Sequence, residues 1–181
     1  AKLIVSAKAG TTDINGATST ATKVHPAGAN FELSVKAFNS LDVITPNYSP
    51  GQIQIKLSRT GPTVGVSADG NFNYATTGLL KAYLNPEFEN VTLSDFSSGV
   101  SNYSEAQYSE VGLLNLAVKD SNYGNANITV LADAIDIGRF IPDHFIQTIA
   151  EDGYFLATCN SGTTFAYSGQ KDEATNTIGA I

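Results

Sequence analysis

The chain has 181 residues, of which 42% are hydrophobic and only 15% are charged, and its formal net charge is -7. A single domain of this length buries a sizeable core without disulfides or metal ions. No apolar run approaches the ~20 residues of a membrane-spanning helix. A net negative charge repels polyanions such as nucleic acids. We therefore expect no membrane span within these residues and no nucleic-acid partner.

Alternation of apolar and polar residues predicts a series of strands. The clearest is 31–38, where Phe31, Leu33 and Val35 would share the apolar face of an extended segment. The same alternation predicts strands at 53–58 and 113–119 and, more weakly, at 3–5, 91–93 and 128–130. Further strands are expected at 145–149, 154–158 and 164–167. Only residues 79–84 could form a turn of helix, which Pro86 would end.

Turn signals separate these runs, among them Asn15-Gly16 and Asn122-Tyr123-Gly124. Asn and Gly accept the positive φ that tight turns demand. Short strands between regular turns predict an all-β fold, either a sandwich or a barrel. No helical stretch is long enough for the crossover between parallel strands, which argues against an α/β architecture.

The residue pattern changes after residue 137, where Gly138 and Pro142 lie close together within an apolar segment. We interpret this change as a domain boundary and assign one β domain to residues 1–137. Residues 138–181 are too few to bury a core by themselves. We expect them to form a short β segment that either packs on the first domain or begins a second module that continues past residue 181.

Side chains typical of catalysis are sparse. His25 precedes a proline in an expected turn, and His144 follows Asp143, which should point to the opposite face because neighbours in a strand alternate. The single cysteine, Cys159, cannot form a disulfide within this chain, and we expect it to fill space rather than to act as a nucleophile. No hydrolase, nucleotide or metalloprotease motif occurs. We predict no catalytic residue and no cofactor.

Loops with several acidic or amide oxygens are candidate calcium sites. Asp133 and Asp136 are three residues apart, and Asp69, Asn71 and Asn73 have every-other spacing but a single carboxylate. Neither set reaches the ligand count of a calcium loop. We therefore predict no metal site.

Three tyrosines in loop-like stretches are candidates for ligand binding: Tyr103, Tyr108 and Tyr123. An exposed tyrosine ring can stack on the apolar face of a sugar, and the neighbouring Asn side chains can hydrogen-bond its hydroxyl groups. The alternative is that these tyrosines pack in the core or support turns. The residues alone leave both interpretations open.

Three segments, 108–112, 137–145 and 165–170, resemble a conserved region of the MshQ family. They occur in the same order as in that region and with roughly the same spacing. Members of this family are encoded with the biogenesis machinery of the MSHA type IV pilus in Gram-negative bacteria. The middle segment, Ile-Gly-Arg-Phe-Ile-Pro-Asp-His-Phe, is the most specific, whereas Ser168 stands where a bulkier apolar residue is expected. Residues 27–48 are also similar to bacterial immunoglobulin-like domains. Together with the strand pattern, this resemblance implies an antiparallel β-sandwich of immunoglobulin-like type over residues 1–137.

The resemblance implies an extracytoplasmic protein, at the bacterial cell surface or in the periplasm, with no established enzymatic activity. We expect a structural or adhesive module whose partners are other pilus or cell-surface proteins and surface glycans. The main alternative is a carbohydrate-binding module of an extracellular protein. A fragment of a glycosidase or peptidase is a further alternative, and a pilus subunit proper would need a long apolar N-terminal helix that these residues lack.

Overall fold

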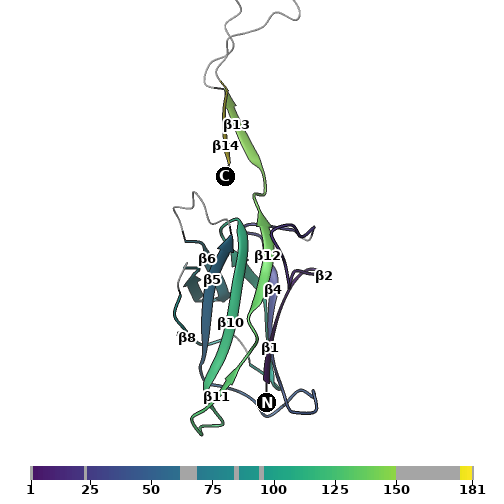
Figure 1. Ribbon diagram of the computed structural model, residues 1–181, viewed down its shortest axis with the longest axis vertical. Coiled ribbons are helices and arrows are strands. Elements are labelled where there is room, and N and C mark those ends of the chain that lie inside the picture. The colour runs from purple at the N-terminus through teal and green to yellow at the C-terminus, as the bar shows by residue number, and fades with distance from the viewer. Residues whose placement is uncertain are drawn as a thin grey trace, which may run out of the picture. The chain divides into compact units, whose positions relative to one another are not determined.

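The computed structural model describes residues 2–22, 24–61, 69–83, 86–93, 96–149 and 176–180. The chain divides into two compact units, Ala1–Ile141 and Pro142–Ile181. Every regular element within the described ranges is a strand (Figure 1). Accordingly, no helix in this part of the chain is long and apolar enough to cross a membrane.

The first unit is a sandwich of two sheets (Figure 1). The first sheet has the strand order β2 (Thr12–Asp13), β1 (Lys2–Ala9), β4 (Phe31–Phe38), β9 (Val100–Tyr108), β6 (Asn71–Ala75) and β7 (Gly78–Lys81). The second sheet has the order β3 (His25–Pro26), β12 (Ile135–Ile141), β10 (Gly112–Tyr123), β5 (Ile53–Gly61) and β8 (Glu89–Val91), and β11 (Ile128–Leu131) pairs with β10. These strands pair antiparallel except β3 with β12, which are parallel. The predicted all-β sandwich is confirmed.

The core forms where the alternating residues of the two sheets meet. Phe31, Leu33 and Val35 on β4 are 1%, 3% and 1% exposed, so the face predicted to be apolar is the inner face. The inward residues of β5 and β10 are equally buried and lie in register, with Leu116 opposite Leu57. Each such side chain contributes ~1.5–3 kcal/mol through burial. The strands predicted at 31–38, 53–58 and 113–119 are therefore confirmed.

An aromatic cluster ties β12 to the first sheet. The ring centroid of Phe140 lies 5.7 Å from that of Phe31, 5.1 Å from that of Tyr108 and 6.0 Å from that of His25. The predicted turn position of His25 is wrong, because this residue lies in β3 and is only 7% exposed. Its Nε2 lies 3.1 Å from the carbonyl oxygen of Ala29. His25 is thus a core residue with a hydrogen-bond partner.

The boundary expected after residue 137 falls inside β12. Leu113 pairs with Gly138 and Gly112 pairs with Phe140, so an irregularity of the β10–β12 ladder occurs at Gly138, not a break between domains. Gly138 has φ +117°, and a Cβ there would lie 3.1 Å from the carbonyl oxygen of Gly112. A glycine that a strand needs for a bulge resembles, in sequence, a glycine of a linker. The first unit therefore extends to Ile141.

The turn of helix expected at 79–84 is also wrong where the structure describes it. Residues 78–81 form β7, which pairs with β6 across a tight turn at 76–77. Leu80 faces the core at 7% exposure, whereas Leu79 is 57% exposed. A run of four residues is too short for its sequence to distinguish a strand period from a helical one.

The second unit contains the hairpin-like pair β13 (Phe145–Ile149) and β14 (Asn176–Ala180). The strands are antiparallel, with Phe145 opposite Ala180 and Ile149 opposite Asn176. This pair confirms the predicted strand at 145–149. The strands expected at 154–158 and 164–167, and Cys159, lie outside the described residues.

Candidate functional site

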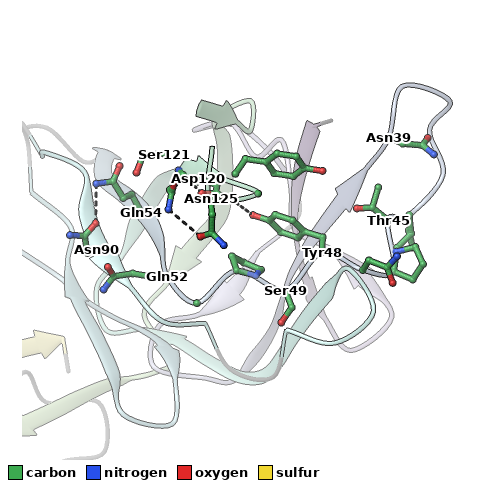
Figure 2. Close-up of a pocket in the computed structure, with 18 residues that line it drawn as sticks. Asn39, Thr45, Tyr48, Ser49, Gln52, Gln54, Asn90, Asp120, Ser121 and Asn125 are labelled. Atoms are coloured by element: carbon green, nitrogen blue, oxygen red, sulfur yellow. Dashed lines mark hydrogen bonds between the residues drawn. The ribbon is translucent and has the colours of Figure 1, made fainter. Parts of the chain in front are cut away.

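A cleft of about 870 Å³ lies in the first unit, where the loop from β4 to β5 meets the turn from β10 to β11 (Figure 2). Most of its lining residues carry an amide or a hydroxyl group, and Ile44, Pro46 and Pro50 add apolar surface. The lining residues are Asn39, Ile44, Thr45, Pro46, Asn47, Tyr48, Ser49, Pro50, Gly51, Gln52, Gln54, Asn90, Asp120, Ser121, Asn122, Tyr123, Gly124 and Asn125.

The loop from β4 to β5 is held by its own polar side chains. Asn39 Oδ1 accepts hydrogen bonds from the backbone N–H groups of Leu41 (2.9 Å) and Val43 (3.0 Å). The N–H of Thr45 donates to the carbonyl of Ala37, and its hydroxyl donates to the same oxygen at 3.2 Å. Such local bonds are the reason that Asn and Thr are favoured in turns. They fix the loop so that Tyr48 enters the cleft.

The opposite wall is the irregular end of β10. Asp120 Oδ1 accepts the backbone N–H of Asn122 at 2.8 Å, and the β10–β11 ladder shifts register between Asp120 and Tyr123. In the turn that follows, Asn125 and Asn127 have positive φ, which Asn tolerates better than most residues. The side chain of Asn122 accepts the N–H of Asn127 at 3.1 Å. The positive φ angles and the side-chain hydrogen bond explain why this segment is rich in Asn.

Tyr48 and Asp120 are the buried members of the lining and Tyr123 is half-buried, so we call these three residues the floor of the cleft. Figure 2 shows Tyr48 beside Asp120. The Tyr48 hydroxyl donates to Asp120 Oδ2 at 2.8 Å, and the two residues are 8% and 4% exposed. The rings of Tyr48 and Tyr123 stack with centroids 5.4 Å apart and an interplanar angle of 20°. Burial, followed by the hydrogen bond to Asp120, raises the pKa of Tyr48. The phenol therefore stays protonated and keeps the carboxylate as its acceptor.

The side walls offer hydrogen-bonding groups without positive charge. Gln54 Nε2 donates to Asn90 Oδ1 at 2.9 Å, across the β5–β8 pair (Figure 2). Asn47 and Gln52 are exposed and make no hydrogen bond with another described side chain or backbone group. Among the described residues that line the cleft, Asp120 is the only carboxylate and none is Lys, Arg or His. This chemistry suits a ligand rich in hydroxyl groups.

The three predicted ligand-binding tyrosines do not come together. Tyr103 lies on β9 and packs partly buried against the core, and Tyr108, at the end of β9, is 1% exposed. The prediction of loop positions for these two is wrong, and Tyr108 has no free ring face. A Cβ at Gly70 would come within 2.7 Å of the Tyr108 hydroxyl, which shows how closely the ring is covered. Tyr123 alone lines the cleft.

Sequence reasoning missed Tyr48, Asp120 and the amides around them. The signal is present in two segments, 45–52 and 121–125, each of which combines a tyrosine with Asn, Ser and Gly and contains no charged residue. Tyr48 and Asp120 are 72 residues apart. Only the fold shows that the two segments face each other.

The acidic residues considered above as calcium ligands do not line the cleft. Asp69 pairs with Arg59 at 3.6 Å, and Asp136 accepts a hydrogen bond from Asn115 Nδ2 at 2.9 Å. Within the described ranges, no group of three His, Cys, Asp or Glu side chains could hold a metal ion.

The expectation that the side chains of Asp143 and His144 point to opposite faces is wrong. In the second unit, Asp143 Oδ2 lies 3.0 Å from His144 Nδ1. Residues 142–144 form a bend rather than a strand, so the alternation of side chains does not apply. Both side chains are more than half exposed.

Comparison with known proteins gives one similarity. Residues 110–181 match the family model described as DUF6701, third domain. The match includes β10, β11 and β12 of the first unit as well as the second unit, so it contains the β10 wall of the cleft but not the loop of residues 39–52. No curated protein and no solved structure matches the chain.

Proposed function

We propose that this protein is a non-catalytic adhesive module that binds a glycan in the cleft between the 39–52 loop and the β10–β11 turn. The observation that carries the proposal is the chemistry of the lining. Amides and hydroxyls surround a stacked pair of tyrosines, and the lining residues that the structure describes include one carboxylate and no basic side chain.

Each part of the lining has a role in this proposal. Asn47 and Gln52 present both hydrogen-bond donors and acceptors, as a sugar hydroxyl does, so either polarity of contact can form. Tyr123 is half-buried and rests one ring face on Tyr48. Its other face can receive the apolar face of a sugar ring. The Tyr48–Asp120 hydrogen bond keeps this platform in place before the ligand arrives.

The wider setting is part of the same proposal. The resemblance of segments 108–112 and 137–145 to the MshQ family supports a place at the bacterial surface or in the periplasm, in a protein associated with a type IV pilus. A rigid sandwich with its cleft at the loops of one end is a suitable arrangement for presenting a binding site. Pilus or other surface proteins would be the neighbours of such a module.

The test is a glycan array probed with the wild-type chain and with Tyr123→Ala. We expect a defined set of glycans to bind and the variant to lose at least about tenfold in affinity, because a stacking platform and its apolar contact are removed. Tyr83→Ala is the matched control, since Tyr83 is 41% exposed and does not line the cleft. Binding to no glycan, or equal losses in the two variants, would contradict the proposal.

A further inference from the structure

Two lysines converge on one aromatic ring beside the cleft. Lys119 Nζ lies 4.2 Å from the ring centroid of Phe88, and Lys56 Nζ lies 5.2 Å from it. Lys119 is on β10, Lys56 is on β5, and Phe88 directly precedes β8. Ala117, opposite Lys56, is only 5% exposed, so the ring and the lysine stems cover this face of the second sheet. The two ammonium groups therefore lie close together over the same ring.

Neither lysine has a carboxylate partner in the described part of the chain. The ion pairs there join Lys2 to Asp42, Arg59 to Asp69 and His144 to Asp143. Asp120 follows Lys119 directly but points to the opposite, inner face, where Tyr48 and a backbone N–H occupy it. In a chain with a net charge of -7, two ammonium groups over one ring, without an ion-pair partner among the described residues, are a local concentration of positive charge.

This site, which we call the lysine pair (Lys56 and Lys119), adjoins the cleft. Lys119 is directly opposite Gln54 in the β10–β5 ladder, and Gln54 donates to Asn90. Gln54 and Asn90 line the cleft. Residues directly opposite on neighbouring strands have Cβ atoms ~4.5–5.5 Å apart. A ligand that contacts Gln54 in the cleft is therefore only one cross-strand neighbour away from Lys119.

We infer that the glycan bound by this module is acidic, with a carboxylate or sulfate group that contacts the lysine pair while its sugar hydroxyls contact the cleft. The inference rests on the proposed function and specifies its ligand class. Among the described residues that line the cleft none is a cation, so recognition of the anionic group falls to the lysine pair. Because both lysines are half-buried and stacked on Phe88, less side-chain entropy is lost when an anion binds than at a mobile surface lysine.

The experiment uses matched pairs of glycans on the array. Oligouronides are compared with their methyl esters, and sulfated oligosaccharides with their unsulfated forms. The wild-type chain is expected to bind the acidic member about fivefold or more tightly, and this preference should weaken as salt is raised. Whichever pair shows the preference identifies the anionic group as carboxylate or sulfate.

The variant Lys56→Gln/Lys119→Gln is expected to bind both members of a pair equally. The control Lys8→Gln/Lys81→Gln removes two exposed lysines of the first sheet, and it should keep the preference while lowering the net charge by the same amount. The inference is overturned if wild type binds neutral members as tightly as acidic ones, or if the preference survives in Lys56→Gln/Lys119→Gln. Binding of neutral glycans alone would leave the proposed function standing and remove only this inference, whereas binding of none would remove both.

Discussion

Replacing Phe140 with alanine is expected to lower the free energy of unfolding of the first unit by about 3–5 kcal/mol. The ring is 1% exposed and contacts Phe31, Tyr108 and His25, so its removal opens a cavity between β12 and the first sheet. Rigid aromatic neighbours fill such a cavity poorly. Urea unfolding monitored by circular dichroism measures the change.

Phe145→Ala is the matched control for this prediction. The same chemical change is made five residues later, but Phe145 lies in the second unit and is 66% exposed. We expect it to alter the stability of the first unit by less than about 0.5 kcal/mol. Equal effects of the two substitutions would show that β12 is not part of the first unit and that the division at Ile141 is misplaced.

Asp120→Ala is expected to cost about 3 kcal/mol, because it leaves one buried and one partly buried donor without an acceptor. These donors are the hydroxyl of Tyr48 and the backbone N–H of Asn122. The substitution should also abolish ligand binding, since the floor of the cleft and the end of β10 depend on the same carboxylate. Chemical unfolding and glycan binding are measured on the same sample.

Asp133→Ala provides the control, because Asp133 is exposed and its substitution should change stability by no more than about 0.5 kcal/mol. A double-mutant cycle with Tyr48→Phe isolates the hydrogen bond, and we expect a coupling energy of about 1–3 kcal/mol. If Asp120→Ala behaves like Asp133→Ala, or if the cycle gives no coupling, the carboxylate does not organise the cleft.

The strands that sequence reasoning found are those with strict alternation. On β4, Phe31, Leu33 and Val35 face the core in turn, as the pattern predicts. The sequence does not predict β9, because its inward residues include Ser101 and Tyr103 and because its pairing with β4 shifts register before Ala106. A bulge breaks the period of two, and a polar inward residue removes the contrast between the faces. Such a strand resembles a loop until its partners are known.

The candidate site was less predictable than the fold. Tyr123 was found as a tyrosine in a polar segment, but nothing local to Tyr48 or Asp120 reveals that the two form a hydrogen bond. Their approach depends on the order of strands in the second sheet, where β10 lies beside β5. Strand order is a long-range property, which alternation along one strand does not encode. The same holds for the lysine pair, which belongs to two different strands.

The location of ligand binding is the central claim of this account, and an NMR titration tests it most directly. The chain is labelled with nitrogen-15 and titrated with the glycan that binds most tightly on the array. We expect the largest shifts at the side-chain amides of Asn47 and Gln52 and at the backbone of 121–125, on both sides of the cleft. Shifts confined to other surfaces, such as β7 or the second unit, would contradict it.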